Sequence, residues 1–338
     1  MLIVQKFGGS SLADAARLRA VAALCLERRR VHELVVVVSA MGDTTDGLSE
    51  RARELLPDPP LRELDALVTT GEQQAAALLV MAMRELGLDA VSLTGWQAGI
   101  LTDRNYGAGE IRFIAPDRVR LELARGRVPV VTGFQGVCAA GDITSLGRGG
   151  SDTTAVALAA ALESELCEIY SDVDGVYTAD PRLVPEARRL DAVDSRDMLA
   201  LARAGAQVLH PRAVELAMAN HVPLRLLSSF SPGQGTLVRR LPDEARPRLA
   251  GITGRAEAGS LTLAGAGADA ACLAESTLLL ARSGIPVQSG AVRGALGERR
   301  DARPRAGAGF RGHAPAPPGD DPAAVRVRYF LPNPSSPA

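Results

Sequence analysis

Lysine, cysteine and histidine are scarce in this sequence of 338 residues, which has one lysine, four cysteines and four histidines. The cysteines are scattered and form no Cys-x-x-Cys pair, so neither a disulfide framework nor a zinc site is expected. Four histidines leave little for a histidine-based mechanism, and His210, which precedes Pro211, is interpreted as structural.

Long apolar runs are also missing, since none reaches the ~18–20 residues that cross a bilayer. The first residues, Met-Leu-Ile-Val-Gln-Lys, lead directly into a strand pattern, without the basic region and cleavage site of a secretory signal. A formal charge of −1 gives no reason to expect nucleic acid or an anionic membrane as the main partner. These absences predict a cytoplasmic protein that binds neither nucleic acid nor a membrane.

The bulk composition is that of an ordinary soluble globular protein, with 46% hydrophobic and 23% charged residues. Its length is sufficient for a large core and for two domains.

Lys6 is the only lysine, so every other basic residue among the 38 is an arginine. A lysine retained against this bias indicates a position that needs a compact ammonium group, which a planar guanidinium cannot replace. Lys6 ends a short strand pattern and precedes Phe-Gly-Gly-Ser-Ser at 7–11, where a glycine turn leads into a helix. This arrangement is typical of phosphate binding, although no Gly-x-x-x-x-Gly-Lys motif of a P-loop is present.

A second glycine turn, Gly-Arg-Gly-Gly-Ser-Asp at 147–152, precedes an uninterrupted run of helix-forming residues from Thr153 to Leu162. Ser151 and Asp152 are both good N-cap residues, so a helix is expected to begin at about one of them. The free N–H groups and the positive dipole end of that helix would point into the glycine turn, which suits an anion.

Strands and helices are expected to alternate over about 240 residues, which predicts an α/β fold with a mostly parallel sheet. Strands are expected at 2–6, 33–39, 90–93, 111–115, 128–132, 166–171 and 223–227, with a hairpin at 136–146. Helices are expected at 13–30, 71–86, 117–125, 195–204 and 212–220.

Polar loops follow two of these strands, at the edge where open α/β sheets bind ligands. Residues 39–46 form one such loop, and residues 171–182 form another that is rich in turn-forming and small polar residues. Glu72 falls in the first turn of a long helix, where an isolated glutamate is more commonly a surface carboxylate.

The composition changes after residue 240. Residues 241–250 are expected to form a linker, and residues 251–292 a small, partial α+β module. Residues 293–338 are expected to be a degenerate or disordered tail, because Gly, Pro, Ala and Arg dominate there until Val325–Leu331.

Several long motifs in this order closely resemble the aspartate kinases of the amino-acid kinase superfamily. They are Lys-Phe-Gly-Gly-Ser-Ser at 6–11, Val-Ser-Ala-Met-Gly-Asp-Thr-Thr-Asp at 38–46, Thr-Gly-Glu at 70–72, Gly-Arg-Gly-Gly-Ser-Asp-Thr-Thr-Ala at 147–155, Ser-Asp-Val-Asp-Gly-Val-Tyr-Thr-Ala-Asp-Pro-Arg at 171–182 and Gly-Ala-Gln-Val-Leu-His-Pro-Arg at 205–212. The resemblance covers residues 1–240 and implies a three-layer α/β/α catalytic domain. It implies transfer of the γ-phosphoryl of ATP, with Mg²⁺, to the β-carboxylate of L-aspartate.

The resemblance also implies residue roles. Lys6 would neutralise the transferring phosphoryl group, and Asp152 would organise the reaction centre through Mg²⁺ or the ammonium network, with no residue assigned as a metal ligand. Arg148 would hold the α-carboxylate of aspartate, and Glu72 its ammonium group. The implied substrate-binding set is Ser39, Thr45, Glu72, Arg148, Gly149, Gly150 and Ser151. The implied nucleotide-binding set is Lys6, Phe7, Gly8, Gly9, Ser10, Ser171, Asp172, Tyr177, Asp180, Arg182 and Gln207.

The sequence departs from the family at two places. Some members have lysine where Gln207 stands, so a phosphate contact is missing there unless Arg182 compensates. The family usually ends in two regulatory ACT domains that bind end-product amino acids such as lysine or threonine. Here residues 260–288 resemble the first half of one ACT domain, and we expect weakened feedback inhibition of an enzyme in lysine, threonine and methionine biosynthesis.

Two alternatives remain open: a kinase for another carboxylate, and a nucleotide-binding remnant or subunit without turnover. Whether the chain forms a homodimer is also left open.

Overall fold

The computed structural model of the protein describes residues 1–247, 250–255, 260–265, 270–282, 287–293 and 324–329. Two compact units divide the chain. The first comprises Met1–Val176 and Val208–Arg239, and the second comprises Tyr177–Gln207 and the described residues of Arg240–Ala338. This division differs from the single boundary expected near residue 240, because residues 177–207 group with the C-terminal part.

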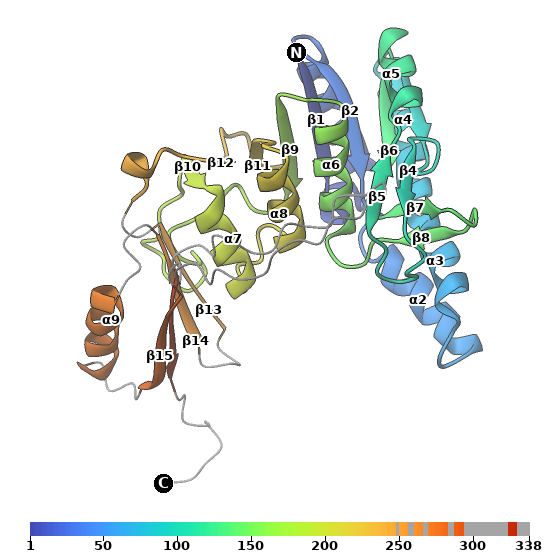
Figure 1. Ribbon diagram of the computed structural model, residues 1–338. Coiled ribbons are helices and arrows are strands. Elements are labelled where there is room, and N and C mark those ends of the chain that lie inside the picture. The colour runs from blue at the N-terminus through green and yellow to red at the C-terminus, as the bar shows by residue number, and fades with distance from the viewer. Residues whose placement is uncertain (248–249, 256–259, 266–269, 283–286, 294–323, 330–338) are drawn as a thin grey trace, which may run out of the picture. The chain divides into compact units, whose positions relative to one another are not determined.

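The first unit is built on a sheet whose strand order is β12-β11-β9-β1-β2-β6-β3 (Figure 1). Neighbouring strands are parallel except for the antiparallel edge pair β11 and β12. The strands are β1 (Leu2–Phe7), β2 (Glu33–Val38), β3 (Ala90–Leu93), β6 (Val128–Thr132), β9 (Leu166–Ser171), β11 (Leu224–Ser228) and β12 (Thr236–Arg239). The valines of β2 are fully buried on both of its faces, as expected for a parallel strand between helices.

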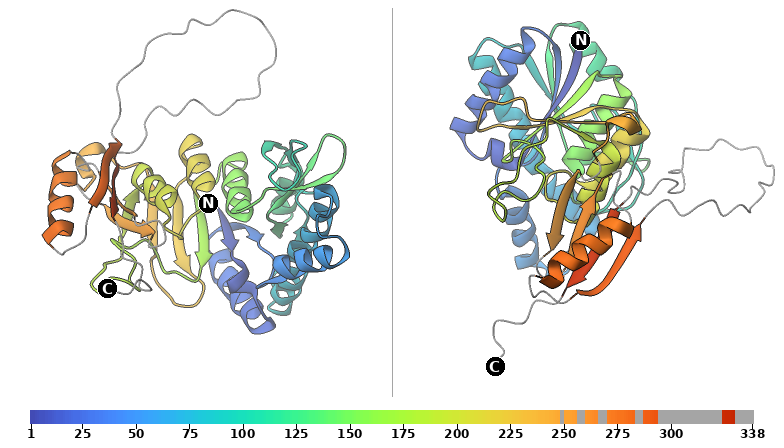
Figure 2. Two further views of the ribbon diagram at one scale, coloured as in Figure 1. Left: turned by 90° about the horizontal axis from the view of Figure 1, so that it is seen from below. Right: turned by 90° about the vertical axis from the view of Figure 1, so that its left-hand side faces the viewer.

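Helices cover both faces of this sheet (Figure 2). Helices α1 (Ala15–Arg29) and α4 (Thr70–Glu85) pack on one face and share a core with β1, β2 and β6. Helices α5 (Asp117–Ala124) and α6 (Gly150–Ala161) cover the other face, and α8 (Pro211–Ala219) packs against α6. The predicted three-layer α/β/α fold with a mostly parallel sheet is confirmed.

A smaller sheet and two short helices extend the first unit. The sheet has the order β5-β4-β7-β8, with β4 (Ile100–Thr102), β5 (Ile111–Ile114), β7 (Gln135–Cys138) and β8 (Ile143–Ser145). Helices α2 (Thr44–Leu55) and α3 (Leu61–Val68) pack against each other, and α3 also packs against β8. Across the described ranges, no helix combines the length and the apolar character required to cross a membrane.

The second unit holds β10 (Ala192–Asp194), α7 (Ser195–Ala204) and a four-stranded antiparallel sheet in the order β13-β14-β16-β15. Its strands are β13 (Gly251–Arg255), β14 (Ser260–Ala264), β15 (Val287–Arg293) and β16 (Ala324–Tyr329). Helix α9 (Ala270–Arg282) packs on β15 and β16, and α7 packs on β13 and β14.

Two expectations for this region need revision. Strand β16 lies within the segment that was expected to be a degenerate tail, and it pairs with both β14 and β15. The rest of that tail, 294–323 and 330–338, lies outside the described residues. The expected linker at 241–250 is anchored, since the Leu241 N–H donates to Asp194 and Arg246 pairs with Asp197.

Candidate active site

Lys6 and Asp152, which are distant in sequence, form an ion pair in the first unit. Lys6 projects from the end of β1, and Asp152 lies in the first turn of α6, which packs against β1. The Lys6 Nζ atom is 2.6 Å from Asp152 Oδ1, and the two side chains are 11% and 15% exposed. The only lysine of the chain is therefore held by a carboxylate at the carboxyl edge of the sheet, the place where α/β folds bind ligands.

The helix that carries Asp152 begins earlier than the sequence indicated. Helix α6 starts at Gly150, and Gly149 is its N-cap with a left-handed φ of 70°. A Cβ atom on Gly149 would lie only 2.2 Å from Cγ of His210, so both backbone angle and space require glycine there. The expectation of a Ser151 or Asp152 cap was therefore wrong, and both residues lie inside the helix, facing a cleft.

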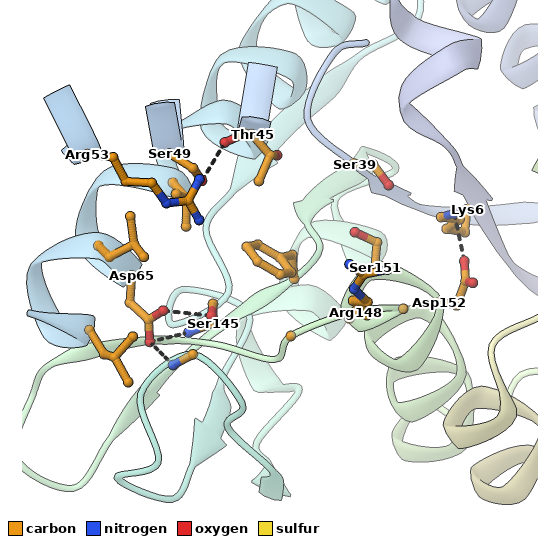
Figure 3. A pocket seen from close by; sticks show the side chains of 18 residues that line it. Lys6, Ser39, Thr45, Ser49, Arg53, Asp65, Ser145, Arg148, Ser151 and Asp152 are labelled. Carbon is orange, nitrogen blue, oxygen red and sulfur yellow. Dashed lines mark hydrogen bonds and ion pairs between the residues drawn. The ribbon is translucent and has the colours of Figure 1, made fainter. Parts of the chain in front are cut away.

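A cleft of about 620 Å³ contains eight of the predicted site residues (Figure 3). They are Lys6, Ser39, Thr45, Arg148, Gly149, Gly150, Ser151 and Asp152. The remaining lining residues are Ser49, Arg53, Leu61, Leu64, Asp65, Val68, Gly107, Phe134, Ser145 and Gly147. The structure thus brings together the predicted catalytic pair and six of the seven predicted substrate-binding residues, whose roles remain predictions.

Arg148 stands in the glycine turn with its side chain exposed to this cleft. Its guanidinium group makes no hydrogen bond or ion pair with any residue in the described part of the chain. Among the lining residues of the cleft it is thus a cation available for a ligand, and its planar fork matches a carboxylate.

Glu72, the seventh predicted substrate-binding residue, is not among the residues that line the cleft. It is in the first turn of α4 and is only 3% exposed, which excludes a surface carboxylate. Its Oε1 accepts a hydrogen bond of 3.0 Å from the N–H of Ala40, whereas Oε2 has no partner among the described residues. Burial raises the pKa of Glu72 to about 7, and the hydrogen bond from Ala40 only partly opposes this.

Thr45 lies on a helix that the sequence analysis interpreted as a polar loop. Helix α2 presents Thr45, Ser49 and Arg53 to the cleft at i, i+4 and i+8. No residue of α2 is buried, and its apolar residues are few: Leu48, Ala52 and Leu55 are the members of its helical stripe. This explains why Ser49 and Arg53 were missed, since only the i, i+4 spacing of polar residues pointed to them.

Part of the glycine turn after β1, which was predicted to bind the nucleotide, is already in contact with other parts of the protein. Phe7 is fully buried and stacks on Tyr170 with ring centroids 4.7 Å apart. The Gly8 N–H already donates to the Tyr170 carbonyl at 3.1 Å. The Phe7 carbonyl likewise accepts the Ser39 N–H at 3.1 Å, so Phe7 offers a nucleotide neither its side chain nor a free carbonyl, and the exposed Ser10 is the more accessible residue of this turn.

The other predicted nucleotide residues divide between the two units. Ser171 ends β9 and is followed by the exposed Asp172, at the sheet edge that carries Lys6. Tyr177, Asp180, Arg182 and Gln207 belong to the second unit. Asp180 and Arg182 form an ion pair of 2.8 Å, and Gln207 is exposed. Their nucleotide role stays a prediction.

The described carboxylates near the cleft do not form a magnesium site by themselves, so Mg²⁺ fits here only when it is bound to the phosphates of the nucleotide. Within the described ranges, no group of three or more His, Cys, Asp or Glu side chains is placed to hold a metal. Asp152 is already paired with Lys6, and Asp65 is surrounded by hydrogen-bond donors. Mg²⁺ commonly reaches such sites on substrate phosphates, with few or no protein carboxylates.

Known proteins resemble this chain in sequence and in fold. Residues 1–228 match the model of the amino acid kinase family. An aspartokinase from Mycolicibacterium smegmatis is 52% identical over 240 residues, covering 70% of this chain and 57% of that protein. An aspartokinase from Corynebacterium glutamicum is 51% identical over 255 residues, covering 75% of this chain and 61% of that protein.

The crystal structure of an aspartate kinase from Synechocystis superposes with a TM-score of 0.65 at 35% identity, covering 97% of this chain and 52% of that one. The chain spans about three fifths of the length of the two curated relatives, and the family model covers most of the first unit together with residues 177–207. The chain belongs to the amino acid kinase family.

Proposed function

We propose that this chain is an aspartate kinase, which transfers the γ-phosphoryl group of ATP to the β-carboxylate of L-aspartate and forms 4-phospho-L-aspartate. The observation that carries the proposal is the Lys6–Asp152 pair in a cleft that also contains Arg148, which has no ion-pair partner in the described part of the chain. Identity of about one half to two aspartokinases supports the same acceptor for this chain. The product would enter the synthesis of lysine, threonine and methionine.

The chemistry requires little more than this cleft offers. A carboxylate is already a nucleophile at neutral pH, so no strong general base is needed. The barrier comes from bringing two anions together in line, which positioning and electrostatic stabilisation lower. The Lys6 ammonium and the free N–H groups at the start of α6 supply positive charge where it develops, and Asp152 fixes the position of Nζ.

The acceptor would be held by charges at its other end. Arg148 would bind the α-carboxylate in a bidentate manner. Glu72 would accept the ammonium group, since one of its oxygens has no partner within the described ranges and an approaching cation would favour its ionised form. This pair of contacts selects a free α-amino acid. Mg²⁺ would arrive on the nucleotide and neutralise phosphate charge.

ATP-dependent acyl-hydroxamate formation by the purified chain with L-aspartate tests the proposal, because hydroxylamine traps an acyl phosphate. A signal that requires aspartate and is absent with N-acetylglutamate or glutamate supports it. A signal with one of those acceptors instead would identify a kinase for another carboxylate. ATP binding by a folded protein without any signal would favour a nucleotide-binding subunit without turnover.

Weakened feedback control remains a proposal, and the same assay tests it. We expect activity to be insensitive to lysine and threonine added together. Saturable inhibition at sub-millimolar levels would contradict it and would indicate a working effector site. A homodimer likewise stays a prediction, which the sedimentation of the intact chain would decide.

A further inference from the structure

Two loop segments, 107–109 and 145–150, lie against each other at one side of the cleft. The Gly109 N–H donates to the Ser145 carbonyl at 2.7 Å. A Cβ atom on Gly147 would lie 3.1 Å from the Gly107 carbonyl oxygen, so the backbones are in close contact. Gly147 and Gly149 both have left-handed φ angles, of 69° and 70°. Arg148 stands between these glycines, and the path of the turn determines where its guanidinium group lies.

Asp65 of α3 joins the two segments through their N–H groups. Its Oδ2 accepts hydrogen bonds of 2.9 Å from the N–H of Gly107 and from the N–H of Ser145, and its Oδ1 accepts one of 2.6 Å from Ser145 Oγ. Asp65 is 2% exposed, and a carboxylate buried this deeply is retained only with such compensation.

Arg212 of α8 joins the same two segments through their carbonyl groups. Its Nη1 donates to the Leu146 carbonyl at 2.8 Å, and its Nη2 donates to the Gly109 carbonyl at 3.3 Å. The neighbouring His210 is the N-cap of α8, and its ring fills the space beside Gly149. The start of α8 therefore contacts the turn on both sides of Arg148.

We propose that Asp65 and Arg212 are positioning residues, which together hold the backbone around Arg148 so that its guanidinium group is aimed at the carboxylate of the substrate. This rests on the proposed function for the identity of that substrate. Asp65 binds the donors and Arg212 the acceptors of the two segments: Arg212 is not part of the cleft lining, and Asp65, which lines it, already accepts three hydrogen bonds from these segments. A glycine-rich turn has little conformational preference of its own, and displacement of about 1 Å at a site can cost about 100-fold in rate.

The primary test is the Arg212→Gln variant. We expect KM for aspartate to rise about tenfold, the loss of about 1.4 kcal/mol of binding, while KM for ATP stays within twofold. Arg212→Lys retains a donor and should recover part of the loss. Arg84→Gln is the matched control, because Arg84 also donates to a backbone carbonyl, that of Ala90, outside the cleft lining. Equal effects of the Arg212 and Arg84 variants would overturn the proposal.

A double-mutant cycle with Arg148→Ala separates positioning from general stabilisation. If Arg212 acts through Arg148, Arg212→Gln should raise KM for aspartate no further once Arg148 is alanine. Additive effects in the cycle would overturn the proposal. Asp65→Asn should likewise raise KM for aspartate and leave KM for ATP nearly unchanged. If Asp65→Asn fails to fold, the double-mutant cycle of Arg212 and Arg148 still tests the proposal.

Hydrogen exchange of residues 145–152 supplies a readout that does not depend on turnover. We expect faster exchange there in Arg212→Gln than in wild type or Arg84→Gln, and unchanged exchange in β1 and β9. Unchanged exchange at 145–152 would overturn the proposal. Loss of the proposed function would instead show as a wild-type chain that forms no hydroxamate, whatever the exchange result, so the two failures are distinguishable.

Discussion

Two buried carboxylates at the starts of two helices have opposite environments. Glu72, in the first turn of α4, has one oxygen that no described residue contacts by a hydrogen bond, and burial raises its pKa to about 7. Asp194 caps α7 in the second unit, where Arg196 binds both of its oxygens and the Leu241 N–H adds a third donor. Burial alone would raise the pKa of Asp194, but these donors hold it below its usual range.

The difference separates charges that stabilise the fold from charges that await a ligand. In the second unit, Arg196 also reaches Asp243, and Arg246 pairs with Asp197, so each of these carboxylates has a cationic partner, although burial still raises the pKa of Asp197. In the first unit, the charge of Arg148 has no partner among the described residues. A protein retains an uncompensated buried or cleft-facing charge at a cost, and such charges cluster where ligands supply the missing partner.

The largest effect is expected at Lys6. Lys6→Ala removes the ammonium group beside the transferring phosphoryl and should lower kcat by about 100- to 1,000-fold, with KM for aspartate little changed. Initial rates of hydroxamate formation measure both constants. Lys6→Arg is the informative partner, since arginine serves as the basic residue everywhere else in this chain. Near-normal turnover of Lys6→Arg would contradict the need for a compact ammonium group.

The compensated charges of the second unit should matter for stability alone. Arg246→Ala leaves the buried Asp197 unpaired and should lower the free energy of unfolding of that unit by about 3 kcal/mol. Hydrogen exchange of α7 measures this. Arg30→Ala breaks an exposed pair with Glu27 and should leave stability unchanged within error. A large loss of stability in Arg30→Ala, or no loss in Arg246→Ala, would contradict the conclusion that the buried ion pairs of the second unit stabilise the fold.

Arg148→Ala should have the next largest effect. Loss of a bidentate contact to a charged group costs about 1.5–3 kcal/mol, so KM for aspartate should rise about 10- to 100-fold. Because the guanidinium makes no hydrogen bond or ion pair with any residue in the part of the chain that the structure describes, thermal stability should not fall. Unchanged saturation by aspartate would show that Arg148 does not bind the acceptor and would remove the main support for a free amino acid as substrate.

The sequence predicted the parts of this molecule that depend on local patterns. Strands such as β2 are continuous apolar runs, and the turn around Arg148 carries a long motif, so both could be located in advance. Helix α2 was missed, because its apolar stripe is short and the helix contains Gly47. The N-cap of α6 was misplaced because side-chain preference favoured Ser151 or Asp152, whereas the contact with His210 demands glycine at 149.

Contacts between residues far apart in the sequence were the other feature that the sequence could not predict. Asp65 lies 80 residues from Ser145 and 42 from Gly107, and nothing in its local sequence marks it as their common acceptor. Strand β16 follows a stretch dominated by Gly, Pro, Ala and Arg, and its pairing with β14 and β15 depends on residues far upstream. In both cases the tertiary fold supplies a partner that local propensity cannot reveal.

The smallest effect is a pH dependence that originates in Glu72. Its pKa of about 7 in the folded protein exceeds the ordinary value of 4.5, so the fold without ligand binds a proton that the unfolded chain has lost. Stability of the free protein should therefore fall as pH rises from about 4.5 to about 7. An ammonium group favours the ionised carboxylate, so KM for aspartate should rise about tenfold between pH 8 and pH 6.

Glu72→Gln distinguishes the titration of Glu72 from that of the residues that line the cleft. Glutamine retains the size of the side chain and an acceptor for the Ala40 N–H but cannot ionise, so KM for aspartate should be higher throughout and nearly independent of pH between 6 and 8. The stabilisation of wild type by bound aspartate, measured as a rise in Tm, should be larger at pH 8 than at pH 6, since binding at low pH must first release a proton. A wild-type KM that is flat over this range, or a slope that survives in Glu72→Gln, would place the ammonium contact elsewhere. Glu72 would then be a buried carboxylate like Asp194 that simply lacks its arginine.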